Sequence, residues 1–207
     1  MIRGTLPALL AAALAIPPAA AQADRPATLP TRDVDVTYRA GQGDRTVSQR
    51  SRWSASERKM RLDTPTPGVY AIVDYAAGTL AMVSERSRGV LDLPAPAGGL
   101  PGQAAPSAAF TRRGTREVAG LPCTEWETRD LQGQATLTCF TDDGVLLQAR
   151  HGAQVLVQAT RVAYGALDLS AFAVPPSYAH EASRTATPQA ATPQAATPQP
   201  ALPGSSR

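Results

Sequence analysis

The sequence predicts a mainly β protein, whose curved antiparallel sheet forms an open half-barrel with at most short helices. Two observations carry this prediction. Apolar and polar residues alternate with a period of two over many short stretches, which is typical of half-buried strands. Glycines and polar clusters separate these stretches, and no long amphipathic helical pattern interrupts them. About ten strands are expected on this basis.

The first half of the chain shows the alternation most clearly. Val34, Val36 and Tyr38 alternate with polar residues, so one face of this strand is expected to be buried. The stretch 76–78, Ala-Ala-Gly, predicts a hairpin turn between two strands. The strands expected in this half cover residues 33–39, 45–53, 59–65, 68–75, 78–84 and 88–94.

A long irregular segment then interrupts the pattern. Residues 94–107 contain four prolines and three glycines, which predicts a loop that is either a lid or an insertion. Beyond it, strands are expected at 115–120, 123–128, 135–140, 144–149 and 153–164. His151 is expected in a tight turn and His180 in the tail, so neither is expected to bind a metal. A short helix is expected at 54–58 or near Ala108.

The only two cysteines, Cys123 and Cys139, lie sixteen positions apart. Three alternatives are open for them: a structural disulfide, free thiols, or a reactive pair. A redox pair usually has the closer Cys-x-x-Cys spacing, and zinc needs about four ligands. In an exported protein a single bridge is favoured. A hairpin centred on Leu131 would place the two cysteines opposite each other on one face, and a bulge at Gly133 would shift that register.

The two ends of the chain differ in composition from its middle. Residues 1–23 carry a basic residue near their start, Arg3, which is followed by an apolar stretch and by the small residues Ala21-Gln22-Ala23. This order predicts a cleaved signal peptide. Residues 24–30 are expected to be a linker, 31–180 one domain, and 181–207 a disordered tail of Ala/Thr/Pro/Gln repeats. The protein is therefore expected in the periplasm, with full secretion left open, and without a transmembrane anchor.

Charge and motifs point away from several function classes. The net charge is +3, and of the 20 basic residues only Lys59 is a lysine. The arginines are expected to form a solvated face, with an anionic partner as the alternative. Export and the lack of an aromatic platform argue against nucleic acid. No catalytic motif is present, so no enzyme, cofactor or metal site is expected.

Four stretches resemble one family. They are "DVDVTYRAG" leading into "KMRLDTP"; "VYAIVDYAAGTLAMVSERSRGVLDL"; "VAGLPCTEWET" followed by "CFTDDGVLLQA"; and "LDLSAFAVPPSY". Over roughly 31–180 the chain resembles the periplasmic lipoprotein-carrier half-barrels (LolA/LolB-like), especially their uncharacterised exported members. The resemblance implies a curved sheet around an apolar cavity partly closed by helices, in proteins that bind acyl chains or lipoproteins or sense the state of the envelope. This chain departs from the true carriers in its weak helical content and its cysteine pair.

A curved sheet must bury its concave face against something, which leads to a functional hypothesis. The protein is expected to be non-enzymatic and to bind a hydrophobic or acyl-chain ligand, such as a lipid or a lipoprotein acyl chain. The alternative is an interaction or structural module with a filled core and an envelope protein as its partner. The candidate ligand contacts, each of which also suits a plain core, are Val36, Tyr38, Trp53, Met60, Leu62, Val73, Met82, Trp126 and Phe172.

Overall fold

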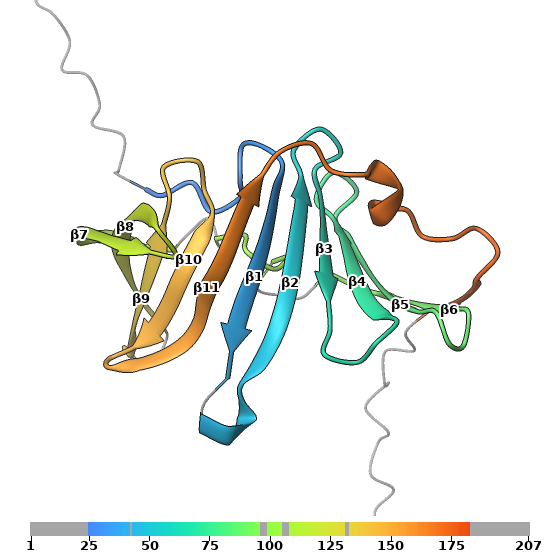
Figure 1. Ribbon diagram of the computed structural model, residues 1–207, viewed down its shortest axis with the longest axis horizontal. Coiled ribbons are helices and arrows are strands. Elements are labelled where there is room, and N and C mark those ends of the chain that lie inside the picture. The colour runs from blue at the N-terminus through green and yellow to red at the C-terminus, as the bar shows by residue number, and fades with distance from the viewer. Residues whose placement is uncertain (1–24, 42, 96–98, 105–107, 131–132, 183–207) are drawn as a thin grey trace, which may run out of the picture.

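A computed structural model describes residues 25–182, apart from 42, 96–98, 105–107 and 131–132. Within these residues the chain forms a single 12-stranded sheet in the order β12-β6-β5-β4-β3-β2-β1-β11-β10-β9-β8-β7. The sheet bends strongly, so its two ends face each other across a hollow (Figure 1). The predicted fold class, a mainly β open half-barrel, is confirmed.

The strands follow the predicted order, and β12 is added at the C-terminal end. The strands of the first half are β1 (Val34–Ala40), β2 (Val47–Ser54), β3 (Lys59–Asp63), β4 (Val69–Asp74), β5 (Thr79–Ser84) and β6 (Gly89–Leu93). Those of the second half are β7 (Thr111–Val118), β8 (Leu121–Arg129), β9 (Ala135–Phe140), β10 (Leu146–His151), β11 (Gln154–Tyr164) and β12 (Ala179–Ala182). Two 3₁₀ turns, η1 (Gly43–Arg45) and η2 (Leu169–Phe172), are the only helical elements among the described residues.

All neighbouring strands are antiparallel except β12 and β6, which run parallel. Directly paired residues share a face of the sheet, and the pairs Trp53↔Met60 and Met60↔Val73 therefore place all three side chains on one side. We call this side, which also carries Val34 and Val36, the concave face.

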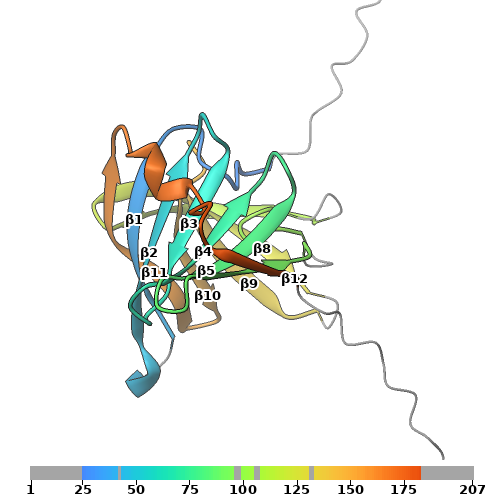
Figure 2. The same cartoon turned by 90° about the vertical axis from the view of Figure 1, so that its right-hand side faces the viewer.

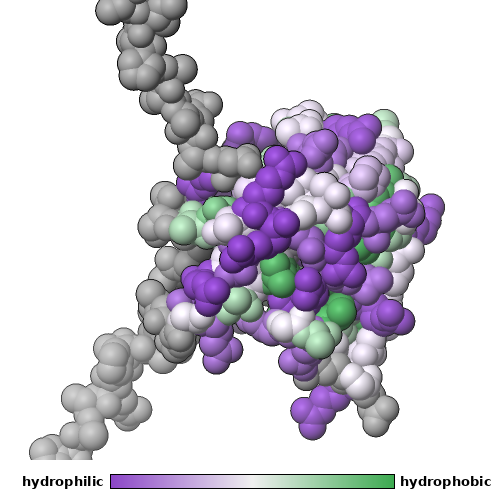
Figure 3. All heavy atoms as spheres, turned by 90° about the vertical axis from the view of Figure 1, so that its left-hand side faces the viewer, coloured by the Kyte–Doolittle hydropathy of each residue, from purple (hydrophilic) through white to green (hydrophobic). Residues whose placement is uncertain are grey.

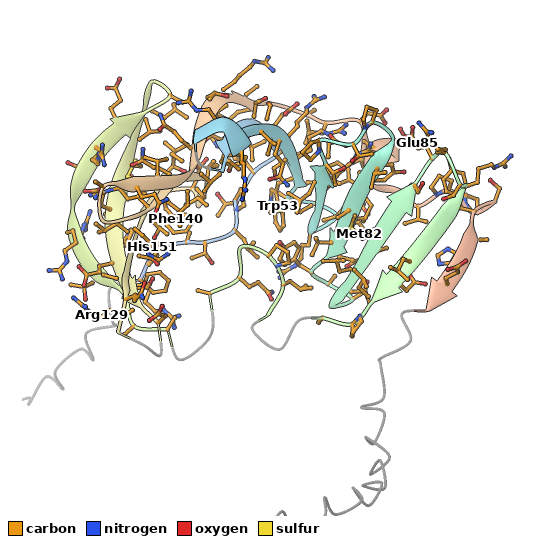
Figure 4. All side chains as sticks on the ribbon, turned by 90° about the horizontal axis from the view of Figure 1, so that it is seen from below. Trp53, Met82, Glu85, Arg129, Phe140 and His151 are labelled. Carbon is orange, nitrogen blue, oxygen red and sulfur yellow. A yellow bond between two sulfur atoms is a disulfide. The ribbon has the colours of Figure 1, made fainter. Side chains whose placement is uncertain are left out.

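The concave face carries the main core. Val34, Val36, Trp53 and Val73 are all buried there, with exposed fractions of 4% or less. The cover is not helical. Figure 4 shows that the segment before β1 and the loop after β6 cross the hollow between the two halves of the sheet. From these two segments Leu29 and Leu100 pack against the core.

The opposite, convex face has a smaller core of its own. Tyr70, Ile72, Val83 and Val90 form it, and the chain after β11 covers it through Val174 and Tyr178. Figure 2 shows this segment, including η2, on the outside of β3 and β4 before it reaches β12. The Arg61 guanidinium lies 3.5 Å from the centre of the Tyr70 ring and donates to the carbonyl oxygen of Ala171 at 3.1 Å. The C-terminal segment is thus fastened to the convex face.

Three expectations about local structure were wrong. Residues 55–58 are the turn between β2 and β3, and the hydroxyl of Ser54, the last residue of β2, accepts from the Glu57 N–H at 3.3 Å. Residues 108–110 are irregular. The sheet has twelve strands in place of about ten. His180 belongs to β12, where its Nδ1 lies 2.9 Å from an Asp92 carboxylate oxygen. A four-residue strand has too few residues to show an alternating pattern.

The expected signal peptide, residues 1–23, lies outside the described residues, as does the repeat tail beyond Ala182. Residues 25–30, expected as a linker, cover part of the concave face, and β12 continues two residues past position 180.

Candidate functional site

The candidate site is a cavity of about 240 Å³ under the concave face. Its wall is the central part of the sheet, where inward-facing residues of β1, β2 and β3 alternate with residues that face outward. They are Val34, Val36 and Tyr38 from β1, Gln49, Ser51 and Trp53 from β2, and Met60 and Leu62 from β3. The alternation seen in the sequence therefore builds this wall directly.

The far side and the roof come from other parts of the chain. Phe140, Val157 and residues 144–146, at the start of β10, close the far side. Thr28 and Pro30, with Pro101 and Gly102, form the roof. The two roof segments also approach each other, because a Cβ added at Gly102 would lie 3.5 Å from Leu29 Cδ2.

Both roof segments are held by specific bonds. The Tyr75 hydroxyl donates to the carbonyl oxygen of Pro101. Within the loop, the Gln103 N–H donates to the Leu100 carbonyl at 3.0 Å. On the other side, the Thr31 N–H donates to the Asp143 carbonyl at 2.9 Å, and the Arg32 Nε lies 2.6 Å from the Asp143 carboxylate. The cavity roof is therefore a fixed part of the fold.

The polar groups in the wall differ in how they are satisfied. The Tyr38 hydroxyl donates to the Leu146 carbonyl at 2.8 Å, and burial raises the pKa of Tyr38 so that it stays protonated. The indole Nε1 of Trp53 is buried and has no hydrogen-bond partner among the described residues. Gln49 and Ser51 add an amide and a hydroxyl on the same strand.

No lining residue carries a charge. The charged side chains of the central strands belong to the opposite face, where they form ion pairs. Arg50 Nε lies 2.9 Å from Asp35 Oδ1, and Asp63 pairs with both Arg52 and Arg61 at 2.7 Å. Burial alone raises the pKa of Asp63, but the hydrogen bonds from the two arginines outweigh it and hold that pKa below its ordinary value. The arginines that were expected to form a solvated face are thus partly engaged in ion pairs with aspartates.

The structure brings five of the candidate ligand contacts together: Val36, Tyr38, Trp53, Met60 and Leu62 line the cavity. Val73 lies beside them as a fully buried core residue. The other three lie elsewhere. Met82 faces the same side of the sheet as Leu62, through the pairs Leu62↔Ala71 and Ala71↔Met82, but it does not line the cavity. Trp126 packs at 6.3 Å between ring centres against Phe110, and Phe172 belongs to η2 on the convex side. Figure 4 shows Trp53 in the middle of the hollow, with Met82 and Phe140 on opposite sides of it.

Sequence reasoning missed the roof and the far side of the cavity. Thr28, Pro30, Pro101 and Gly102 lie in segments without periodicity, so no local signal marks them as inward-facing. Phe140 and Val157 lie in expected strands, but their position opposite β2 depends on the curvature of the whole sheet.

The two cysteines are joined by a disulfide, with a Cα–Cα distance of 5.4 Å. The expected proximity is confirmed, but the expected register is not. Because Glu125 pairs directly with Cys139, the bridge runs diagonally between β8 and β9. The loop closes between Asp130 and Gln134, which moves its centre one residue beyond Leu131. Neither cysteine lines the cavity.

The two histidines have neighbours of their own. The His151 ring lies within 3.2 Å of the Thr136 hydroxyl and the Ala135 carbonyl, at the end of β10.

In the part of the chain that the structure describes, no three His, Cys, Asp or Glu residues gather in a way that would hold a metal ion. Over the same residues, no helix has the length and hydropathy to cross a membrane.

No protein-family model matches this sequence, and no curated protein matches it. Solved structures do resemble the fold. An uncharacterized conserved protein from Thermus thermophilus aligns with a TM-score of 0.53 at 10% identity, covering 73% of this chain and 91% of its own. PNGF-II aligns at 0.48 and 12% identity, over 74% of this chain and 31% of its own. MucB, solved in complex with MucA(peri), aligns at 0.40 and 17% identity, over 66% and 51%. At such identities the likeness concerns the fold alone, and the chain shares its curved-sheet fold with the Thermus protein.

Proposed function

We propose that this is an exported, non-enzymatic binding protein that holds an apolar group in the cavity under its concave face. The observation that carries the proposal is the wall itself. Val36, Trp53, Met60 and Leu62 turn apolar surface toward a space of about 240 Å³ without any charged neighbour. An apolar cavity of about 150 Å³ in another protein is large enough to bind benzene.

The size of the cavity limits what it takes. Pockets that enclose whole drug-sized ligands usually measure about 300–1,000 Å³. The present cavity is slightly smaller, so it suits a short acyl chain or the end of a longer one. A bound chain would replace contacts that the wall residues otherwise lack, at about 25 cal/mol per Å² of apolar surface removed from water.

Export is proposed on separate grounds. The first 23 residues have the charge, apolar core and small-residue end of a signal peptide. The Cys123–Cys139 disulfide fits an oxidising compartment such as the periplasm. The resemblance to lipoprotein carriers agrees with both proposals.

The test measures binding of N-phenyl-1-naphthylamine, a neutral apolar fluorophore, to the mature chain purified without detergent. Val157→Phe places a ring in the cavity and is expected to weaken binding at least tenfold. The matched control is Val155→Phe, on the same strand but 37% exposed and outside the cavity, which should bind like the wild type. Equal binding by both variants, with melting temperatures unchanged, would refute the proposal. Mass spectrometry of an organic extract then identifies any lipid that copurifies.

A second candidate function is recognition of an extended peptide along β7. This strand ends the sheet, and seven of its eight residues are exposed. Its Arg113 and Arg116 pair with Glu127 and Glu125 on β8. Figure 3 shows that this end of the molecule presents mostly hydrophilic residues. A partner strand could pair with the free edge through main-chain hydrogen bonds.

The test for this second function places a photocrosslinker at Thr115 on the edge strand, with Leu169 on η2, 47% exposed, as the control position. A defined adduct from Thr115 alone, retained after removal of residues 183–207, supports edge recognition without the tail. Equal labelling from both positions excludes it.

A further inference from the structure

The convex face of the central strands carries an excess of positive charge. Figure 1 shows β11, β1 and β2 side by side in the middle of the sheet. Where these strands pair, their convex side presents four arginines and one acid, and we call it the basic face: Arg39, Arg50, Arg52, Arg161 and Asp35. Its excess of three positive charges equals the net charge of the whole chain, +3, so the rest of the chain sums to zero.

Two of these arginines have no counterion in the fold. Arg39 and Arg161 are exposed, and among the described residues no carboxylate lies within ion-pair distance of either. Arg50 is close to both, because Thr37 of β1 lies directly opposite Arg50 on one side and Arg161 on the other. From the spacing of strands and residues, these three arginines lie within about 10 Å of each other.

The third arginine, Arg50, is held outward by an acid that lies beneath it. Its Nε donates to the two carboxylate oxygens of Asp35 at 2.9 and 3.1 Å, and its Nη2 donates to the second of them as well. The Asp35 side chain is 10% exposed, whereas that of Arg50 is 49% exposed. The Nη1 group has no partner among the described residues, so its N–H donors are available to an acceptor outside the chain.

The next strand shows how the same fold neutralises arginines that lie close together. Arg52 and Arg61 are directly opposite each other, an arrangement of like charges that is destabilising on its own. Asp63 compensates it by pairing with both arginines at 2.7 Å. Arg39 and Arg161 have no such acid, and they lie within about one Debye length of Arg50. An anion from outside the chain would therefore relieve a repulsion that the fold leaves in place.

The chemistry of the basic face indicates which anion fits. Arginine binds phosphate through two parallel N–H donors, which makes it the preferred residue for phosphate recognition. The neighbouring side chains on this face are Thr37, Ser48 and Gln158, so it lacks the buried aromatic or aliphatic anchor on which most protein partners depend. The arginines are spread over three strands of a convex surface, which suits many phosphates in a layer better than a single small anion.

We propose that the basic face docks the protein on an anionic phospholipid bilayer, whose headgroup phosphates accept hydrogen bonds from Arg39, Arg50 and Arg161. This inference goes beyond the proposed function, because the basic face and the apolar cavity lie on opposite sides of the sheet. The docked protein would hold its cavity and roof away from the bilayer. Membrane docking and ligand binding are therefore expected to be independent of each other.

The first experiment measures flotation of the mature chain with vesicles of phosphatidylcholine that contain about 30% phosphatidylglycerol. Arg39→Gln/Arg161→Gln should weaken binding about 25-fold, since each arginine near an anionic membrane contributes about fivefold. The matched control is Arg58→Gln/Arg86→Gln, which removes the same charge from exposed turns after β2 and β5. The control should weaken binding less than threefold. Equal weakening by the two double variants would overturn the inference, because net charge alone would then explain the binding.

Lipid composition and salt test the electrostatic origin of the docking. Vesicles of pure phosphatidylcholine should not bind, and raising the NaCl concentration from about 0.05 M to about 0.5 M should release the protein from the anionic vesicles. Binding to neutral vesicles, or binding that survives the added salt, would indicate apolar insertion and refute the inference. If the anionic vesicles do not bind the wild type, the inference also fails and an acidic protein becomes the expected partner of this face.

A second experiment determines which side of the molecule meets the bilayer. An environment-sensitive nitrobenzoxadiazole label is attached at Ser48→Cys, on the strand position opposite Arg39, or at Ser87→Cys, in the exposed turn after β5. Anionic vesicles should shift the emission of the first label to shorter wavelength and leave that of the second unchanged. Equal shifts at the two positions would contradict docking through the basic face.

The variant Val157→Phe, which fills the cavity, separates this inference from the proposed function. It should float with anionic vesicles like the wild type, since Val157 lines the cavity and not the basic face. Weaker flotation of this variant would mean that the cavity captures the lipid, and the inference would fail. A wild type that binds N-phenyl-1-naphthylamine but no vesicles refutes only the docking. A wild type that binds anionic vesicles but not the fluorophore refutes only the proposed function.

Discussion

The hydroxyl of Tyr75, directly after β4, donates a hydrogen bond to the main-chain carbonyl of Pro101, in the loop that follows β6. The same ring packs against Trp53, so one side chain connects the wall of the cavity with its roof. Burial raises the pKa of Tyr75, which keeps the donor protonated. The bond joins residues 26 positions apart and helps the irregular loop to remain over the core.

Tyr75→Phe should loosen this part of the roof without disturbing the sheet. The lost hydrogen bond is worth about 1 kcal/mol, so local opening of the loop should increase about fivefold. Hydrogen exchange of the Gln103 amide, which bonds to Leu100 within the loop, reports the change. The matched control is Tyr38→Phe, which removes a bond to β10 and should leave Gln103 unaffected. Equal exchange in all three proteins would show that the bond does not hold the loop.

Removing the disulfide should weaken the fold and spare the cavity. Both cysteines are at least 97% buried and lie away from the cavity lining. Closing a loop of about 15 residues is worth about 3 kcal/mol in the chain-entropy model. The double variant Cys123→Ala/Cys139→Ala should therefore unfold at lower denaturant concentration, while the folded protein still binds N-phenyl-1-naphthylamine. Loss of binding at unchanged stability would place the cysteines in the function and contradict this prediction.

Acid should weaken the attachment of the N-terminal roof segment through Asp143. Burial by itself raises the pKa of Asp143, but hydrogen bonds from Thr141, Arg32 and Tyr164 outweigh it, so the pKa is below its ordinary value. A carboxylate with a lower pKa in the folded state stabilises that state above the unfolded pKa, about 4. This contribution is lost as the pH falls through the folded pKa.

Asp143→Asn isolates this contribution. The variant should be less stable than the wild type near pH 6, and the difference should shrink below about pH 4. Urea unfolding at several pH values measures both proteins. Asp142→Asn, at the exposed neighbour, is the matched control for removing one carboxylate from this turn. A wild-type–variant difference that stays constant down to about pH 2 would rule out a role for ionised Asp143.

Gly144 should tolerate no side chain, because two separate effects oppose one. Its φ of +91° is in the left-handed region, and a Cβ there would overlap the carbonyl oxygen of Leu29 in the roof segment. Gly120 has a similar φ of +74°, but a Cβ there meets nothing within 4 Å. Gly120→Ala should therefore cost about 1–2 kcal/mol from the backbone alone. Gly144→Ala should cost clearly more, as measured by thermal unfolding. Equal losses of stability in the two variants would mean that the roof segment moves away from the added methyl group without a cost in free energy.

The strands could be predicted because their signals are local. Val34, Val36 and Tyr38 face inward at every second position, and the turn after Asp74 follows from the residues next to it. The roof could not be predicted in this way. Leu29 and Leu100 are buried by contacts with distant strands, and nothing in their immediate neighbourhood signals it.

The part of the candidate site that could be predicted is the wall formed by strands that follow each other directly in the sequence. Trp53, Met60 and Leu62 lie on consecutive strands joined by a tight turn, so their common face follows from the alternation. Trp126 alternates in the same way, but on β8, where Arg112 and Phe110 occupy the space beside its ring. Alternation shows that a residue faces inward and leaves open which part of a curved sheet it reaches.

The parallel strand β12 has a consequence for solubility. It pairs with β6 and is itself the edge strand at this end of the sheet, opposite β7. Very short edge strands are one way in which proteins limit pairing with other chains. With four residues, β12 offers a shorter edge than the five-residue β6 that a truncation before Ala179 would expose. Such a truncation is therefore expected to make association through this edge easier.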